Sequence, residues 1–434
     1  MLKEKVTVIG AGLAGCEAAH KLSTLGFKVR LCEMKPEKYT PAHKSENFAE
    51  LVCSNSLKAM RLGSAAGLLK EEMRMLGSIT MEAAEKTSVA AGGALAVDRE
   101  KFAEYITEKI KSDPNIEIVY GEVTEVPEDG IVVFTTGPLT SDALAEKLQE
   151  RFNGTLSFYD AVAPIVSADS LDWDKVFMGA RYDRGEADYV NCPMERDEYD
   201  AFYEALVNAE RAPLHDFDVA DPKVYEGCMP VEIMASRGHD TLRFGPLRPV
   251  GLTDPHTGKR PWANVQLRRE NAEGTMYNLV GFQTNLKFGE QKRVFSMIPG
   301  LENAEFLRYG VMHRDTFMDS PRLLSKNLSL KAEPRLFFAG QFTGVEGYTE
   351  SAATGILAGI NAARFAEGKE PLILPELTML GALVNYITDE NVENFQPMGA
   401  NMGLLPPLPT KIRHKDERYL AVAERAVAAM EAIL

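Results

Sequence analysis

The sequence predicts an α/β protein whose parallel sheet is assembled from two distant parts of the chain. Residues 6–9 form a short, apolar, β-branched run near the N-terminus, and residues 336–339 form a second apolar run, after Arg335, near the other end. Both runs are typical of buried parallel strands, and each is followed by glycines and a helical pattern. Between residues 159 and 321, short strand patterns alternate with Pro, Gly, Asp and aromatic residues, which indicates an inserted α+β domain.

A glycine motif follows the first strand directly and opens a helix. It consists of Gly10, Ala11, Gly12, Leu13, Ala14 and Gly15. Gly10 permits a tight turn, Gly12 lets a pyrophosphate approach the backbone, and Gly15 lets the helix pack closely on the strand. Glu33 ends the next strand, where a carboxylate can accept both ribose hydroxyls of an adenosine. The strand, the glycines, the helix and the terminal acid all match the pattern of a dinucleotide-binding motif. We therefore predict a Rossmann-type dinucleotide-binding unit and not a glycine-rich turn that binds nothing.

The next elements are typical of the first half of an FAD-binding domain. Asp98 is expected to cap a helix that begins at Arg99. Strands are expected over residues 117–120 and 131–134. The second of these strands ends in Thr-Thr-Gly-Pro, which makes Gly137 an expected cofactor contact.

The late strand ends in Phe-Phe-Ala-Gly and precedes a glycine-rich turn. In flavoproteins with two such segments, this strand brings backbone amides to the ribityl chain and pyrophosphate, and the helix after it points its N-terminus at the flavin. A simple NAD domain does not need the second segment, so the expected cofactor is FAD. The expected contacts are Gly340, Gln341, Glu346, Gly347 and Tyr348.

At 434 residues the chain is too long for one compact core. We predict a glutathione-reductase-like FAD-binding domain over residues 1–158, an inserted substrate domain over 159–321, and the rest of the FAD-binding domain with C-terminal helices over 322–434. No window of about eighteen apolar residues predicts a membrane helix. The first strand begins too early to leave room for a signal peptide.

Two of the five cysteines occupy positions that favour reactivity. Cys53 lies in Val-Cys-Ser-Asn-Ser-Leu at an expected helix start, where the helix dipole would lower its pKa. Cys228 lies between Gly and Met-Pro, which indicates a constrained turn. The sequence leaves open whether each thiol is catalytic or structural. Cys16 and Cys32 are expected in the core, and Cys192 stays undecided.

The cysteines are odd in number and scattered, which argues against a disulfide framework and favours the reducing cytoplasm. None forms a CxxC pair or lies beside His at zinc spacing, so no metal site is expected. The net charge of −15 argues against a nucleic-acid binder. Residues 237–293, however, hold ten basic and five acidic side chains, near +5. That stretch is either a phosphate-binding surface or a solvated face with ion pairs.

The whole chain resembles the folate- and FAD-dependent tRNA (uracil-5-)-methyltransferase family, TrmFO. The motifs that carry the resemblance lie at residues 10–19, 49–58, 136–141, 158–161, 226–232, 244–252, 281–284, 308–314 and 338–348. They follow the family order along nearly the entire chain. The larger tRNA wobble-uridine modification flavoprotein shares the FAD motif, but its longer C-terminal helical region is expected to be lacking here. Met229 and residues 401–403 depart from the family pattern and put no catalytic residue in doubt.

The resemblance implies formation of 5-methyluridine in the T-loop of tRNA, in the cytoplasm. Methylenetetrahydrofolate would donate the carbon, and FAD reduced by NAD(P)H would carry the methylene and reduce it. Cys228 would add to uracil C6, and Cys53 would act near the flavin as base or adduct partner, although the sequence leaves their division of roles open. The alternatives are a flavin-dependent dehydrogenase or reductase acting on a small molecule, and a flavoprotein that binds RNA without modifying it. The sequence does not distinguish NADH from NADPH and does not give the oligomeric state.

Overall fold

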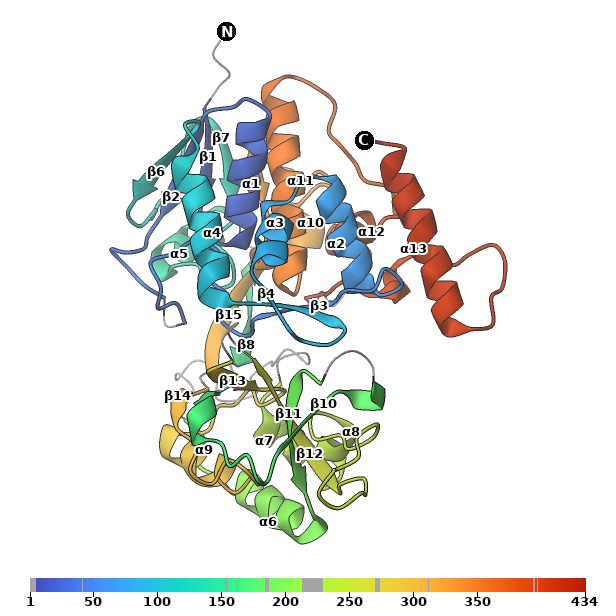
Figure 1. Ribbon diagram of the computed structural model, residues 1–434. Coiled ribbons are helices and arrows are strands. Elements are labelled where there is room, and N and C mark those ends of the chain that lie inside the picture. The colour runs from blue at the N-terminus through green and yellow to red at the C-terminus, as the bar shows by residue number, and fades with distance from the viewer. Residues whose placement is uncertain are drawn as a thin grey trace.

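The computed structural model describes most of the chain, which folds into two bodies (Figure 1). The described residues are 5–40, 42–152, 155–161, 163–183, 187–212, 229–269, 274–310, 312–392, 395 and 397–434. Cys228, one of the two expected catalytic thiols, lies outside these ranges.

A five-stranded parallel sheet forms the centre of the larger body. Its strand order is β16-β7-β1-β2-β6. The strands are β1 (Val6–Ile9), β2 (Val29–Glu33), β6 (Ile116–Tyr120), β7 (Ile131–Phe134) and β16 (Leu336–Phe338). β16 comes from far along the chain and pairs in parallel with β7, and the rings of Phe338 and Phe134 stack with their centres 4.8 Å apart. The predicted fold class, with one sheet assembled from two distant segments, is confirmed.

Two helices pack against each other beside this sheet at unusually close range. α1 (Leu13–Thr24) follows β1, and α11 (Tyr348–Ala366) follows β16. A Cβ on Gly355 of α11 would lie 2.2 Å from the carbonyl oxygen of Ala14, and one on Gly359 would lie 2.9 Å from that of Ala18. Only glycine permits this approach. The pairing of 355 with 14 and of 359 with 18 shows that the helices run in the same direction, so both N-termini lie at the same end of the sheet.

The other helices of the larger body are α2 (Ala65–Met75), α3 (Ile79–Lys86), α4 (Arg99–Ser112), α5 (Asp142–Phe152), α10 (Ser320–Leu323), α12 (Met379–Ile387) and α13 (Lys415–Glu431). Of these, α2, α3, α4 and α12 pack against the pair of α1 and α11 (Figure 1). α4 begins at Arg99 after an Asp98 cap, as predicted. The carboxylate of Glu72 in α2 accepts the N–H groups of Met379 and Leu380, at 2.6 and 2.8 Å, and so holds the start of α12. Burial raises the pKa of Glu72 to about 7.

The smaller body has a six-stranded antiparallel sheet of order β10-β11-β12-β13-β9-β14. Its strands are β9 (Ile165–Ser167), β10 (Phe177–Gly179), β11 (Tyr189–Met194), β12 (Ala263–Arg269), β13 (Met276–Leu279) and β14 (Phe306–Arg308). Its helices are α6 (Arg196–Val207), α7 (Val231–Ser236), α8 (Thr241–Phe244) and α9 (Phe288–Phe295). Phe202, Phe282 and Phe295 are buried in a hydrophobic core that is separate from the core of the larger body.

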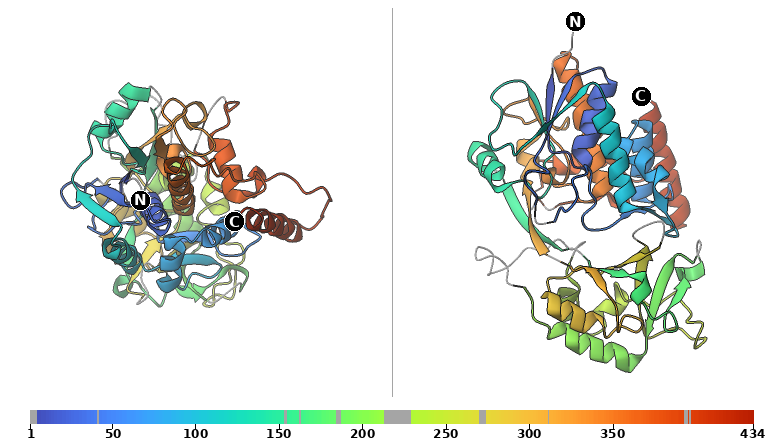
Figure 2. Two further views of the ribbon diagram at one scale, coloured as in Figure 1. Left: turned by 90° about the horizontal axis from the view of Figure 1, so that it is seen from above. Right: turned by 60° about the vertical axis from the view of Figure 1, so that its left-hand side comes forward.

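The antiparallel pair β8 (Thr155–Ala161) and β15 (Met312–Met318) joins the two bodies, as Figure 1 and the right-hand view of Figure 2 show. The domain limits drawn from the sequence, at 158/159 and 321/322, stay a prediction. A small sheet of β3 (Ser56–Ala59), β5 (Ala94–Val97) and β4 (Ser88–Val89) faces the inserted body. Among the described residues, no helix is both long enough and apolar enough to cross a membrane.

Candidate active site

A long pocket lies at the carboxyl ends of the parallel strands, where ligands bind in open α/β sheets. It holds about 1220 Å³ of empty space, its open mouth included. The segments that line it come from both halves of the larger body. Of the residues predicted from the sequence, those on its wall are Gly10, Ala11, Gly12, Leu13, Ala14, Glu33, Cys53, Gly137, Gly340, Gln341 and Tyr348.

Three predicted residues lie just behind this wall. Gly15 lies under the first glycine turn, and Gly347 precedes α11 as its N-cap. The Glu346 carboxylate accepts a hydrogen bond from the side-chain amide of Gln341 at 2.8 Å and so holds that wall residue. The sequence predicted all three as cofactor contacts, and none of them is among the residues that line the pocket.

The three glycines of the first turn differ in what a Cβ atom at each position would contact. A Cβ on Gly15 would lie 1.8 Å from the Gly10 carbonyl oxygen, and Gly10 itself has φ +98° with Thr135 close behind it. Both positions therefore need glycine for the fold. A Cβ on Gly12 would meet nothing within 4 Å, because it would point into open space beside the pocket wall. This gap, at the N-terminus of α1, fits the pyrophosphate of a dinucleotide.

Glu33 is fixed at the end of β2 by the backbone. One carboxylate oxygen accepts the N–H of Ala11 at 2.8 Å, and the other accepts the N–H of Lys35 at 2.9 Å. Each oxygen keeps a second lone pair for a ribose hydroxyl. Glu33 is only 7% exposed, so the carboxylate is held in one orientation toward the pocket.

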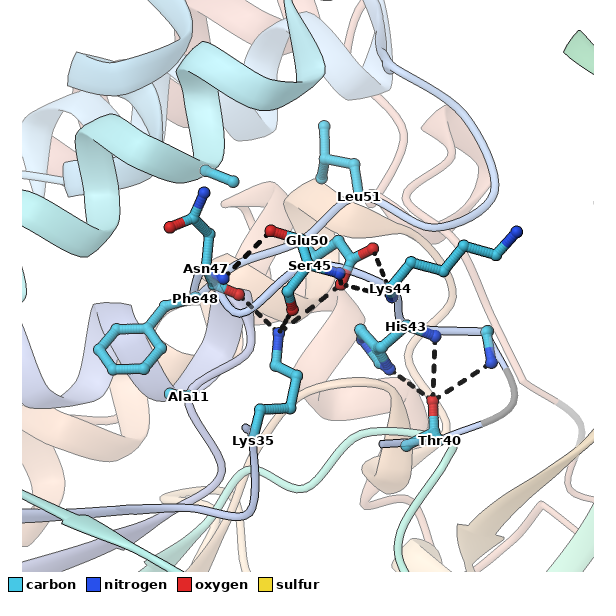
Figure 3. A network of polar contacts seen from close by, with 12 residues as sticks. Ala11, Lys35, Thr40, His43, Lys44, Ser45, Asn47, Phe48, Glu50 and Leu51 are labelled. Atoms are coloured by element: carbon cyan, nitrogen blue, oxygen red, sulfur yellow. Dashed lines mark hydrogen bonds and ion pairs between the residues drawn. The ribbon is translucent and has the colours of Figure 1, made fainter. Parts of the chain in front are cut away.

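The segment after β2 adds Lys35, Thr40, His43 and Glu50 to the pocket lining, which was not expected from the sequence. Figure 3 shows the polar contacts of this segment. The Lys35 ammonium donates to the carbonyl oxygens of Ser45 and Asn47 and lies 3.6 Å from the Glu50 carboxylate. That carboxylate also accepts the N–H of Lys44 at 3.0 Å. These contacts depend on a loop without hydrophobic periodicity. In the sequence, the features that could have indicated this fold are Lys35, Glu50 and the polar run between them, which ends at the buried Phe48.

At the other glycine turn, the two halves of the site meet directly. Gly340 has φ +81°, and a Cβ there would lie 3.1 Å from the Ala14 side chain at the start of α1. The Gly340 N–H donates to the Thr354 hydroxyl at 2.9 Å, which ties the turn to α11. The N-termini of α1 and α11 therefore border one pocket and can face the two ends of the same bound cofactor.

Cys53 lies on the pocket wall in a loop before β3, so the expected helix start at this position is wrong. No helix dipole acts on the thiol from its own segment. The loop is held by other elements instead. The Tyr348 hydroxyl accepts the N–H groups of Cys53 and Ser54, at 2.7 and 3.2 Å. The Arg99 guanidinium donates to the carbonyl oxygen of Leu51 at 2.8 Å.

The other described cysteines are buried and unsuited to nucleophilic attack. Burial raises the pKa of the Cys16 thiol well above its usual value and raises that of Cys32. Cys192, which the sequence left undecided, is fully buried in the core of the inserted body, where burial also raises its pKa. Among the described cysteines, only Cys53 is partly exposed, and only Cys53 and Cys32 line the pocket. The described residues contain no group of three or more His, Cys, Asp or Glu that could hold a metal ion.

The basic stretch at residues 237–293 is not one continuous surface. Arg268 is 8% exposed and faces the Cys53 loop, so it belongs neither to a phosphate-binding surface nor to a solvated face. Arg243 pairs with Asp240, and Arg293 pairs with Glu290. The exposed cations of the same stretch include Arg237, Arg248, Lys259, Arg260 and Lys292.

A parallel sheet built from two segments, a glycine turn at each, and an inserted antiparallel domain define an FAD-dependent oxidoreductase-like fold. Residues 5–370 match the family model described as glucose inhibited division protein A. The chain is 60% identical over 424 residues to methylenetetrahydrofolate--tRNA-(uracil-5-)-methyltransferase TrmFO of Ligilactobacillus salivarius (strain UCC118), which covers 97% of this chain and 96% of that protein. The chain belongs to the TrmFO family.

Two further comparisons agree with this assignment. The protein of the same name from Enterococcus faecalis (strain ATCC 700802 / V583) is 60% identical over 428 residues, or 98% of each chain. Among solved structures, Aquifex aeolicus GidA in its form II crystal has a TM-score of 0.71 at 18% identity, with 100% of this chain and 73% of that chain covered. At that identity the structural match supports the fold alone.

Proposed function

We propose that this chain is an FAD-dependent tRNA methyltransferase that forms 5-methyluridine in the T-loop, with methylenetetrahydrofolate as carbon donor and NAD(P)H as reductant. The observation that carries the proposal is that Cys53 lies on the wall of the pocket that both dinucleotide turns line. The 60% identity to TrmFO proteins over nearly the whole chain supports the same reaction. Since tRNA is modified where it is made and used, we place the reaction in the cytoplasm.

The residues of the pocket divide into two groups that suit the two ends of FAD. Glu33 would bind the adenosine ribose, and the gap at Gly12 with the N-terminus of α1 would receive the pyrophosphate. Gly340 and Gln341, with the N-terminus of α11, would contact the flavin end. When bound there, FAD supplies one-carbon transfer and hydride chemistry that no side chain can perform.

The thiols supply what uracil lacks, because its C5 carbon is a poor nucleophile. When a thiolate adds to C6, an S–C6 bond forms and the C5–C6 π pair moves toward O4, which makes C5 nucleophilic. After C5 has taken up the carbon, a base removes the C5 proton and the bond from the carbon to its donor breaks, which leaves an exocyclic methylene. Hydride, which FAD would supply when bound, then adds to that carbon, and the S–C6 bond breaks and returns the thiolate. We propose Cys228 as the C6 nucleophile and Cys53 as the base or adduct partner near the flavin.

Exposed cations offer sites for the tRNA backbone on this acidic protein. They include Arg248, Lys259 and Arg260 in the inserted body, and Lys411 and Arg413 in the loop before α13. Neutralised phosphates release counterions, so such binding weakens steeply with salt.

The direct test is incubation of the purified protein with unmodified tRNA, methylenetetrahydrofolate and NAD(P)H, followed by nucleoside analysis. We expect 5-methyluridine that depends on the folate and carries its label. Reduction of the flavin without a tRNA product would favour a small-molecule reductase. Salt-sensitive tRNA binding without a product would favour an RNA-binding flavoprotein.

A further inference from the structure

The two residues that follow Cys53 connect the larger body to the inserted body. Asn55 is fully buried, and its side-chain amide donates to the carbonyl oxygens of Val97 in β5, at 3.0 Å, and of Arg269 in β12, at 2.7 Å. These oxygens belong to different bodies. The segment that carries Cys53 therefore also forms part of the contact between the two bodies.

Arg268 of the inserted body adds to this contact. It lies on β12 in the interior of the six-stranded sheet, opposite Tyr189 of β11. Its Nε donates to Oδ1 of Asn55 at 3.0 Å, and its Nη2 donates to the hydroxyl of Ser54 at 2.6 Å. A planar guanidinium holds two acceptors in a fixed relation, and hydrogen bonds from a charged donor are stronger than neutral ones.

The larger body holds the same short loop from the opposite side. The Tyr348 hydroxyl accepts the Cys53 and Ser54 N–H groups, and Arg99 holds the carbonyl oxygens that precede Cys53. Because the loop is neither helix nor strand, these side-chain contacts fix its conformation. Among the described hydrogen bonds, the other one that holds this loop from the inserted body joins the Asn55 amide to the Arg269 carbonyl oxygen.

We propose that Arg268 is a positioning residue that fixes the Cys53 thiol against the cofactor pocket through Ser54 and Asn55. These contacts are direct, so Arg268 acts on the loop itself and not through the general seating of the inserted body. The inference rests on the proposed function only in that Cys53 takes part in methylation. The placement of the thiol itself can be measured without turnover.

A second contact between the bodies provides a matched control. The Asp188 carboxylate accepts the N–H of Gly92, and the Tyr189 hydroxyl donates to the Ala91 carbonyl oxygen at 3.4 Å. Asp188 is buried, as Arg268 is, and immediately precedes the strand beside β12. It does not contact the Cys53 loop in any described hydrogen bond. Asp188→Ala should therefore loosen the seating of the inserted body without releasing the loop.

The experiment compares Arg268→Gln, Arg268→Lys and Asp188→Ala in FAD-loaded protein. The rate of Cys53 alkylation by iodoacetamide is followed by peptide mass spectrometry across pH, together with single-turnover methylation and KM for tRNA. In Arg268→Gln we expect alkylation to change about fivefold or more and single-turnover methylation to fall about tenfold. FAD content and KM should stay within about twofold. Lysine should restore little, because it cannot make both bonds in one geometry.

Ser54→Ala completes a double-mutant cycle with Arg268→Gln, and the two losses should not add. It also keeps the proposal testable if Arg268→Gln fails to fold. Parent-like alkylation and turnover in Arg268→Gln would overturn the proposal, and so would an equal change in Asp188→Ala. If the parent makes no 5-methyluridine, the proposed function fails, whereas the alkylation rates still decide whether Arg268 positions the thiol.

Discussion

Gly12 and Gly15 lie three residues apart in one motif, and the structure predicts opposite outcomes when each receives a side chain. Gly12 has φ −73° and ψ −170°, which any residue can adopt, and its Cβ would point into open space. Gly12→Val should therefore fold with a stability within about 0.5 kcal/mol of the parent. Gly15→Ala would place a Cβ 1.8 Å from the Gly10 carbonyl oxygen. The backbone must then shift, at a cost of about 3 kcal/mol or more.

The two substitutions should affect cofactor binding in the opposite order. Gly12→Val should weaken FAD binding more than Gly15→Ala does, although it destabilises the fold less. A valine at Gly12 would occupy the gap that fits the pyrophosphate and would remove about two charge-assisted hydrogen bonds from backbone amides, worth roughly 1.5–3 kcal/mol each. The FAD affinity of Gly12→Val should fall by about two to four orders of magnitude. The assay is titration of the apoprotein with FAD, with thermal unfolding of the same samples as the stability measurement.

The contrast between the two variants makes the reasoning refutable. Parent-like FAD affinity in Gly12→Val would show that the gap does not hold the pyrophosphate. A loss of stability in Gly12→Val as large as that in Gly15→Ala would show that the open space beside Gly12 is needed for folding.

Three further predictions follow from the thiols, the exposed cations and a buried carboxyl group. Cys228→Ala should keep FAD and oxidise NAD(P)H but make no 5-methyluridine, whereas Cys53→Ala should lose methylation and also alter the flavin spectrum; wild-type methylation by Cys228→Ala would refute the nucleophile assignment. Lys259→Glu with Arg260→Glu should reduce the salt slope of tRNA binding by about 2, and an unchanged slope would show that these cations face only solvent. Burial raises the pKa of Glu72 to about 7, above its ordinary 4.5, so the folded state binds the carboxyl proton more tightly than the unfolded state does. The protonated carboxyl group therefore contributes stability at low pH, and this contribution is lost as pH rises from 4.5 through 7. Relative to Glu72→Gln, the parent should lose up to about 3 kcal/mol over that range, measured by urea unfolding at a series of pH values, and parallel curves would contradict the shift.

The sequence by itself determined the dinucleotide-binding unit and the fold class. The strand, the three glycines, the helix and Glu33 form a continuous pattern in which each residue type has a local physical reason. The second glycine turn repeats that logic, so both turns could be recognised although they are far apart in the chain. The structure places them side by side, with Gly340 against Ala14.

Only the tertiary structure decided the surroundings of Cys53 and the role of the basic stretch. The sequence around Cys53 was expected to start a helix, but this segment is a loop held by Tyr348 and Arg268, each more than two hundred positions away in sequence. Charge counting also could not separate Arg268, which is buried, from Arg260, which is exposed, because burial depends on strand pairing and on the neighbouring body. Periodicity reports local structure, whereas a loop without periodicity takes its conformation from partners that only the folded chain brings together.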